Sequence, residues 1–210
     1  MKRMAPGADV ASARALNVPA CPPRRVGVFG GTFDPPHIGH VSVARDVADV
    51  LGLDELVWVP AFRSPHKPDR PQTSPGVRLE MVRCAATADP RFRVDDCEIR
   101  RKGPSYTIDT LRSIRAEDSN DIVLIIGADQ FAAFDQWKTP EAIRALATIA
   151  VMDRGGETGR ESPGVLRVPV GRVDVSSTAV RERVARGDSI EGWVPDEVAA
   201  VIEREGLYRS

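Results

Sequence analysis

The stretch 122–126 constrains the fold more strongly than any other part of this sequence. It reads IVLII, a continuous apolar run without alternation between apolar and polar residues. Strands of this kind are buried on both faces, as in a parallel sheet that helices cover on both sides. The runs at 26–29, 56–60 and 148–152 have a similar character. The sequence therefore predicts a parallel sheet between two layers of helices.

Segments with helical signals alternate with these strands. Ser74 and Pro75, for example, offer an N-cap and a proline for the first helical position. Further strands are expected at 92–94 and 165–170, helices at 41–51, 75–88, 108–114, 128–134, 140–147, 176–186 and 195–205, and loops at 61–75, 100–104 and 154–164. This alternation predicts an α/β fold, an open doubly wound parallel sheet that forms a single domain over residues 24–210. Ligands of such sheets bind at the carboxyl ends of the strands, where the strand order reverses.

Composition limits the partners and the compartment. Residues 1–23 are rich in Ala and Pro and are interpreted as a flexible N-terminal extension. A net charge of −1 gives no field for polyanions, so nucleic acid is disfavoured as a partner. No apolar run approaches the ~20 residues that span a bilayer. The cysteines at 21, 84 and 97 show no metal-binding spacing, which fits reduced thiols in a cytoplasmic protein.

The stretch 30–40, GGTFDPPHIGH, follows the first strand directly. Gly30 and Gly31 lack a Cβ, so a phosphate can lie against their backbone, and the helix start behind them adds N–H groups and a positive dipole end. His37 and His40 are spaced to share one face of a helix and to point at the same ligand. Two imidazoles there can donate hydrogen bonds to oxygens that gain charge in a phosphoryl-type transfer. The alternative is a histidine pair satisfied by the protein itself.

The stretch 175–181, VSSTAVR, is the second strong signal. Ser176, Ser177 and Thr178 offer hydroxyl groups at a helix start. Arg181 lies about one turn inside the helix, where its guanidinium can fork onto a phosphate. The alternative is an ordinary helix N-cap.

These two stretches resemble the signatures of the nucleotidylyltransferase superfamily. GGTFDPPHIGH contains the HxGH element, which class I aminoacyl-tRNA synthetases share, and VSSTAVR is similar to the ISSTxIR element. The resemblance implies the Rossmann-like nucleotidylyltransferase fold and catalytic roles for His37, His40 and Arg181. It also implies that ATP and its phosphates bind to Gly30, Gly31, Thr32, Phe33, Gly39, Ser176, Ser177 and Thr178. The fingerprint G-x-G-x-x-G and the P-loop are absent, which disfavours a nicotinamide-dependent dehydrogenase and a Walker-type ATPase.

Further features narrow the resemblance to the nicotinate mononucleotide adenylyltransferases of bacteria. They are the stretches PSYTIDTL and GAD, followed by Trp137, and the resemblance covers the chain after its N-terminal extension. It implies that Tyr106, Thr107 and Trp137 line a nicotinate pocket, where an indole face can stack on a pyridine ring, and that Asp129 binds a ribose. The alternatives are a core position for Tyr106, a helix-end cover for Trp137 and a helix N-cap for Asp129.

The implied reaction is transfer of the AMP group of ATP to nicotinate mononucleotide, which gives deamido-NAD and pyrophosphate in NAD biosynthesis. Mg²⁺ is expected to arrive with ATP, because the sequence shows no dedicated set of metal ligands. The stretch SPHK resembles the family's PPHK loop, so Lys67 is a candidate phosphate ligand, with His66 beside it. The alternative for both is a solvated cationic loop.

Two other functions stay open. One is another adenylyl- or cytidylyltransferase such as the pantetheine-phosphate enzyme, although that family usually has Thr at the position of His37. The other is a nucleotide-binding regulator without turnover, which release of pyrophosphate from ATP would exclude. A tRNA synthetase is excluded by the length of 210 residues. The sequence leaves open the choice between acid and amide mononucleotide, and the oligomeric state, with a homo-oligomer as one option.

Overall fold

The computed structural model describes residues 23–63, 72–117, 121–153 and 163–209. In these ranges one sheet of six parallel strands has the order β3-β2-β1-β4-β5-β6. The strands are β1 Arg25–Gly31, β2 Glu55–Pro60, β3 Phe92–Val94, β4 Asp121–Gly127, β5 Thr148–Asp153 and β6 Val165–Pro169. The predicted open, doubly wound α/β sheet is confirmed.

The strand order reverses between β1 and β4. From β1 the chain winds outward through β2 to β3, and it then crosses back to place β4 on the other side of β1. Gly31 ends β1 and Gly127 ends β4, so the carboxyl ends of both strands lie at this reversal. An open α/β sheet binds its ligands at such a point.

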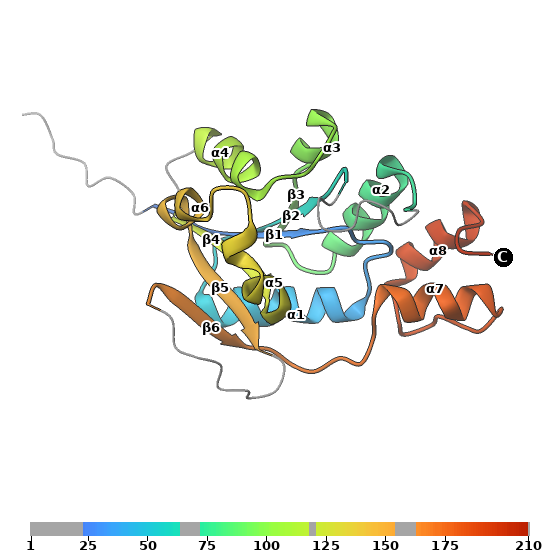
Figure 1. Cartoon of the computed structure of the whole chain (residues 1–210). Coiled ribbons are helices and arrows are strands. Elements are labelled where there is room, and N and C mark those ends of the chain that lie inside the picture. The colour runs from blue at the N-terminus through green and yellow to red at the C-terminus, as the bar shows by residue number, and fades with distance from the viewer. Residues whose placement is uncertain (1–22, 64–71, 118–120, 154–162, 210) are drawn as a thin grey trace, which may run out of the picture.

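The helices connect the strands and cover both faces of the sheet. They are α1 Ile38–Leu51, α2 Pro75–Ala86, α3 Cys97–Arg101, α4 Thr107–Glu117, α5 Ala128–Ala132, α6 Pro140–Leu146, α7 Ser177–Ala185 and α8 Asp196–Arg204, with a 3-10 turn η1 at Phe134–Gln136. Figure 1 shows α4 and α6 on one side of the sheet and α1 on the other. Both sides of the sheet are therefore shielded from water, as its apolar strands require.

The central strand β4 supplies side chains to two cores. Ile122, Leu124 and Ile126 belong to the core shared with α4 and α6. Val123 and Ile125 belong to the core shared with α1, α2, α7 and α8. None of the five is more than 3% exposed. The apolar run without alternation thus has the physical cause that the sequence predicts, which is burial on both faces.

Two short elements differ from the sequence prediction. The helix α3 was not predicted, and it extends into the expected loop 100–104, because Cys97 and Ile99 are too few apolar residues to show a helical period. Its start is fixed instead by Asp95, whose Oδ1 accepts the N–H of Cys97 at 2.8 Å. The helix predicted to run to residue 134 ends at Ala132, because the following 3-10 turn carries Phe134 into the core at 1% exposure.

Some predictions concern residues outside the described ranges. They include the N-terminal extension up to residue 22, His66, Lys67 and most of the loop 154–164. Among the described helices, none combines the length and the apolar composition needed to cross a membrane.

Candidate active site

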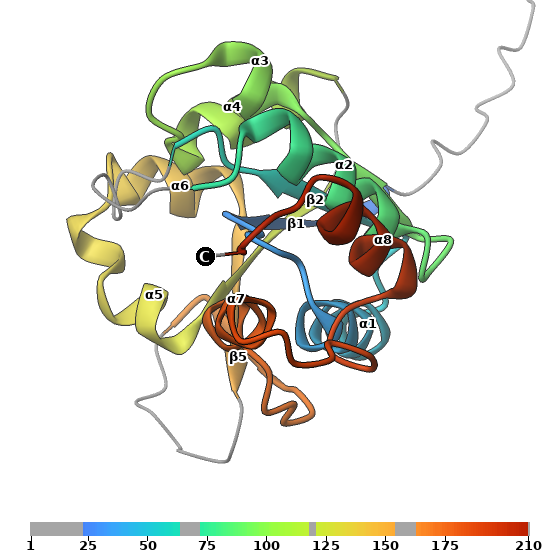
Figure 2. The same cartoon turned by 90° about the vertical axis from the view of Figure 1, so that its right-hand side faces the viewer.

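A cavity of about 920 Å³ opens at the carboxyl ends of β1 and β4. Figure 2 looks onto this end of the sheet and shows α4, α5 and α7 around the end of β1. The residues of the predicted site that line the cavity are Gly30, Gly31, Thr32, Phe33, Gly39, His40, Tyr106, Thr107, Asp129, Trp137, Ser176, Ser177, Thr178 and Arg181. His37 does not line it, and Lys67 lies outside the described residues. Stretches far apart in the sequence therefore meet at one opening.

The loop after β1 is shaped by the ring of Phe33. This residue has a φ of 50° and is 3% exposed. A Cβ on Gly31 would lie 2.8 Å from the ring, so the protein itself requires glycine at this position. At Gly30, by contrast, a Cβ would meet nothing within 4 Å. The backbone at Gly30 is thus open to the cavity, which leaves room for a phosphate to approach it.

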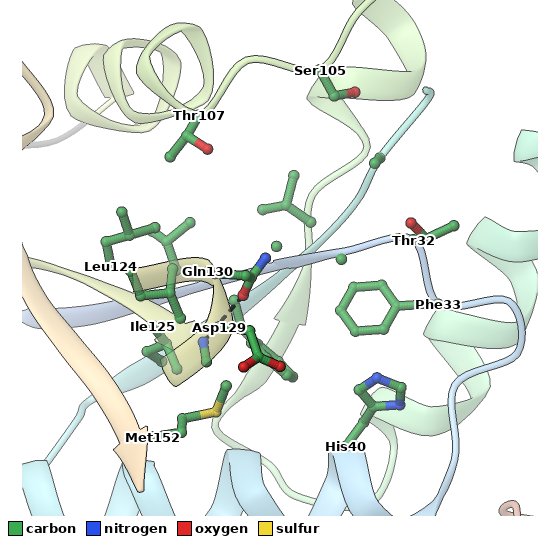
Figure 3. A pocket seen from close by; sticks show the side chains of 18 of the residues that line it. Thr32, Phe33, His40, Ser105, Thr107, Leu124, Ile125, Asp129, Gln130 and Met152 are labelled. Carbon is green, nitrogen blue, oxygen red and sulfur yellow. Dashed lines mark hydrogen bonds between the residues drawn. The ribbon is translucent and has the colours of Figure 1, made fainter. Parts of the chain in front are cut away.

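The two histidines are neighbours, but they do not share a helix face as their spacing predicts. The backbone of His37 is extended, with φ −141° and ψ 171°, so this residue is the N-cap and α1 begins at Ile38. Its ring is 5% exposed and packs behind that of His40, with 3.7 Å between the ring centroids. Of the pair, only His40 lines the cavity (Figure 3).

A hydrogen bond fixes the tautomer that a neutral His40 adopts. The backbone N–H of His37 donates to Nδ1 of His40 at 3.2 Å. Because a neutral imidazole has one acceptor and one donor nitrogen, the proton of His40 then lies on Nε2. His40 also meets the edge of Phe33, with 5.2 Å between the ring centroids and 73° between the planes. The loop therefore orients His40 with a donor nitrogen opposite to its anchored one.

Some of the backbone N–H groups at the start of α1 already donate hydrogen bonds within the protein. The N–H of Ile38 donates to the carbonyl of Trp193 at 3.0 Å, and that of His37 to His40. A Cβ on Gly39 would lie 3.0 Å from Nδ1 of His37, so glycine here makes room for the buried imidazole. Fewer N–H groups are thus available to a ligand at this helix start than the sequence analysis assumes.

The helix α7 is tied to the loop after β1. Nη1 of Arg181 donates to the carbonyl of Asp34 at 2.6 Å, and Nη2 donates to Oγ1 of Thr178 at 3.1 Å. The hydroxyl of Ser177 donates to the carbonyl of Pro35 at 2.8 Å. Ser176 accepts the N–H of Ala179 at 3.1 Å and is the N-cap of α7, so the ordinary capping role holds for this one serine.

Sequence reasoning missed a buried arginine that braces this loop. Arg78 is fully buried, and its guanidinium donates to the carbonyls of Thr73, Thr32 and Phe62 at 3.0, 2.8 and 3.0 Å. Burial lowers the pKa of Arg78, while the charge of Asp34 acts in the opposite direction. One signal was available: helical spacing from the apolar positions of α2 puts Arg78 on the buried face.

On the opposite side of the cavity, the start of α4 presents Tyr106 and Thr107. The carbonyl of Tyr106 accepts the N–H of Asp109 at 3.0 Å, and Nζ of Lys138 lies 4.3 Å from the centre of its ring. Trp137 packs on Phe134, with 5.3 Å between the ring centroids. Tyr106 and Trp137 are both half-buried against the core and both line the cavity. The core and pocket alternatives for these two residues are therefore compatible.

Three further side chains complete this wall. Asp129 lies in the first turn of α5, but the N-cap is Gly127, so the capping alternative for Asp129 is wrong. Figure 3 shows its carboxylate beside Gln130, whose Oε1 accepts the N–H of Gly127 at 3.1 Å. Glu98, which sequence reasoning missed, is buried and accepts from Oγ1 of Thr110 at 2.5 Å. Burial raises the pKa of Glu98, although hydrogen bonds from Thr110 and Ser105 act in the opposite direction.

Metal ligands do not cluster in the part of the chain that the structure describes. No group of three or more His, Cys, Asp or Glu side chains there has the arrangement to hold a metal ion. Asp34, the acidic residue of the loop after β1, is 7% exposed and accepts from Tyr208 and Thr73 instead.

Known proteins match this chain over most of its length. A family model described as Cytidylyltransferase-like matches residues 28–183. A protein of Thermus thermophilus named probable nicotinate-nucleotide adenylyltransferase is 42% identical over 187 residues, which cover 88% of this chain and 100% of the relative. A protein of the same name from Shouchella clausii is 39% identical over 186 residues, with coverage of 88% and 97%.

Solved structures share the fold. The Plasmodium falciparum nicotinic acid mononucleotide adenylyltransferase complexed with NaAD matches with a TM-score of 0.73 at 17% identity, over 88% of this chain and 97% of that one. A putative nicotinate-nucleotide adenylyltransferase from Vibrio parahaemolyticus matches with a TM-score of 0.64 at 20% identity, over 89% and 96%. At these identities the likeness concerns the fold.

Proposed function

The chain belongs to the nicotinate-nucleotide adenylyltransferases of the cytidylyltransferase-like family, and we propose that it transfers the AMP group of ATP to nicotinate mononucleotide. The products are nicotinate adenine dinucleotide and pyrophosphate. One observation carries the proposal for this cavity: His40 and Arg181 line the same opening as Tyr106 and Trp137. A volume of about 920 Å³ lies near the upper end of ligand pockets, as a dinucleotide product requires.

The two ends of the cavity suit different parts of the substrates. The phosphate half consists of the loop after β1 with His40, and of the α7 start with Arg181. The ring half consists of Tyr106, Thr107 and Trp137, with Lys138 beside them. In this proposal the triphosphate lies in the phosphate half and the pyridine ring lies in the ring half.

The chemistry needs placement and charge stabilisation more than proton transfer. An oxygen of the mononucleotide's 5′-phosphate attacks the α-phosphorus of ATP and forms a new P–O bond. The bond from the α-phosphorus to the bridging oxygen of pyrophosphate breaks, and its electrons stay on that oxygen. Because the attacking phosphate is already an anion, no general base is required. The Nε2–H of His40 then donates to a phosphate oxygen that gains charge in the transition state.

Arg181 and the start of α7 would hold the departing pyrophosphate. The helix dipole and the Thr178 hydroxyl lie on the same side of the cavity as the guanidinium. The Ser177 hydroxyl already donates to the carbonyl of Pro35, so it would place the start of α7 rather than donate to phosphate. His37 would orient His40 rather than touch phosphate, because it packs behind that ring. Mg²⁺ would enter as part of the substrate MgATP, since it offsets the triphosphate charge and keeps most of its ligands from phosphate and water.

The ring half would recognise the nicotinate nucleotide. The indole of Trp137 can stack on the pyridine ring. The Tyr106 and Thr107 hydroxyls and nearby N–H groups can donate to its carboxylate. Asp129 would accept from the ribose hydroxyls, a role that fits a carboxylate in the first turn of α5 on the cavity wall.

The test uses the purified full chain with ATP and Mg²⁺. Nicotinate mononucleotide, nicotinamide mononucleotide and phosphopantetheine are offered in parallel, and dinucleotide and pyrophosphate are both quantified. The proposal expects equal amounts of both products, with the highest kcat/KM for the nicotinate nucleotide. Faster reaction with phosphopantetheine would favour the rival enzyme, and ATP binding without pyrophosphate release would favour a regulator.

A further inference from the structure

We infer that Tyr208 is a positioning residue for the phosphate half of the cavity and acts through Asp34. The inference rests on the proposed adenylyl transfer and adds to it a residue from the far end of the chain. Tyr208 does not line the cavity itself. It reaches the site through a chain of hydrogen bonds between buried or half-buried groups.

The first link joins Tyr208 to the loop after β1. The phenol donates to Oδ1 of Asp34 at 2.7 Å, across 174 positions of sequence. Oδ2 of Asp34 accepts the N–H of Thr73 at 3.2 Å, and the Thr73 hydroxyl donates to the phenol oxygen at 3.3 Å. Three groups from three parts of the chain thus close a small ring of hydrogen bonds.

The second link joins Asp34 to Arg181. Nη1 of Arg181 donates to the main-chain carbonyl of Asp34 at 2.6 Å. The side chain of Asp34 therefore fixes the residue whose carbonyl orients the guanidinium. A rotation of this peptide would move the guanidinium relative to Thr178, its second partner. Loss of the Tyr208 hydroxyl should thus loosen a group that faces the triphosphate in the proposed function.

The backbone conformation at Tyr208 directs the phenol toward Asp34. Tyr208 has a φ of 62°, a left-handed conformation that is uncommon for a residue other than glycine. Two residues earlier, Gly206 also has a positive φ, and the N–H of Leu207 donates to the carbonyl of Ile202. Burial raises the pKa of the Tyr208 phenol, and its bond to Asp34 acts in the same direction. The phenol therefore stays protonated, as a donor, at neutral pH.

The contacts of Tyr208 and Asp34 predict an effect on one substrate only. Their hydrogen bonds within the described residues run to Thr73 and Arg181, and none joins them to the Tyr106, Thr107 or Trp137 side chains. If Tyr208 had a merely structural role, its loss would weaken the binding of both substrates alike. If Tyr208 positions the phosphate half, its loss should weaken the binding of ATP alone.

The experiment compares Tyr208→Phe with a matched control, Arg204→Ala. Phe keeps the ring and removes the donor. Arg204 lies in the same C-terminal region and pairs with Glu80 at 2.8 Å, away from the loop after β1. We measure KM for each substrate, and Kd for an ATP analogue that cannot be cleaved. For Tyr208→Phe we expect KM and Kd for ATP to rise ~10-fold, the effect of losing one hydrogen bond to a charged acceptor. KM for the mononucleotide should change less than ~2-fold, and the control should behave as wild type.

Two outcomes would overturn the inference. One is an unchanged affinity for ATP, and the other is an equal loss for both substrates. The route through Asp34 has its own check, in a background where Asp34→Ala removes the acceptor of the phenol. There Tyr208→Phe should raise KM for ATP by less than a further ~2-fold, because the effects of coupled residues are not additive. A wild-type chain that binds the ATP analogue but makes no dinucleotide would refute the proposed function. The Kd comparison would still decide the role of Tyr208.

Discussion

The loop of the phosphate half is braced by buried charged groups, whereas the ring half also depends on an ion pair that water reaches, beside the buried Glu98 and Thr110. Around the loop after β1, Arg78 is fully buried and Asp34 is 7% exposed. Around the start of α4, the side chains of Lys138 and Asp109 form an ion pair at 3.2 Å with exposures of 47% and 30%. A buried donor keeps its strength and direction, while an exposed ion pair is worth ~1 kcal/mol or less.

This difference matches what the proposed function requires of each half. Charge that develops at phosphorus must meet donors that are already in place, because moving them during the reaction would raise the barrier. A pyridine ring carries a fixed charge and shape, so side chains can adjust to it when it binds. Substitutions in the phosphate half should therefore affect stability and turnover, and those in the ring half should affect affinity and substrate choice.

The largest effect is expected from Arg78→Ala. Three carbonyls would lose a charged donor and Asp34 a neighbouring cation, so the free energy of unfolding should fall by about 3 kcal/mol or more. Urea unfolding measures it. The control Arg83→Ala lies on the same helix, with 62% exposure and 3.8 Å to Asp96, and should change the free energy by less than ~0.5 kcal/mol. If both variants lost the same free energy of unfolding, the hydrogen bonds of Arg78 would not stabilise the loop after β1.

A smaller effect, on kcat, is expected from His40→Ala. Loss of one preorganised donor should lower kcat ~10²-fold, or about 2.7 kcal/mol of barrier, with little change in KM. Steady-state kinetics for both substrates provide the test. Val50→Ala serves as a control because Val50 is 55% exposed on the same helix. Near-normal turnover of His40→Ala would remove this residue from the mechanism.

Arg181→Lys should have an intermediate effect. Lysine keeps the charge but cannot hold the Asp34 carbonyl and Thr178 at once, as the planar guanidinium does. We expect KM for ATP to rise ~10-fold, measured at saturating mononucleotide. The control Arg183→Lys lies on the same helix, where Arg183 stacks on Trp193 and bonds to Ser189. If Arg181→Lys is as active as this control, pyrophosphate binds elsewhere.

The smallest effects are expected in the ring half, on the choice between acid and amide mononucleotide. Trp137→Ala should weaken the binding of both mononucleotides by similar factors, because an indole face stacks on either ring. Thr107→Val should narrow the preference for the acid by ~5-fold, because a hydroxyl donor suits a carboxylate better than an amide N–H₂. The ratio of kcat/KM values for the two substrates measures this. A ratio that responds to Trp137→Ala alone would contradict this picture of the ring half.

Much of the site could be predicted because its signals are local. A glycine turn after a buried strand, or hydroxyls at a helix start, occupy a few consecutive residues, and the sheet then brings such carboxyl ends together. The same local reasoning misplaced His37 on the helix, because spacing alone does not show where a helix begins. It also missed Glu98, since an isolated carboxylate in a short helix has no sequence pattern of its own.

The sequence by itself determined the parallel sheet, the alternation of its helices and the location of the glycine turn after β1, because apolar period and backbone sterics act within a few residues. Only the tertiary structure decided which side chains fix the loop after β1 by hydrogen bonds. Tyr208 and Asp34 are 174 positions apart, and Arg78 bonds to three carbonyls of two separate segments. Such contacts depend on burial, which makes an unpaired charge or hydroxyl costly, and burial is a property of the packed chain.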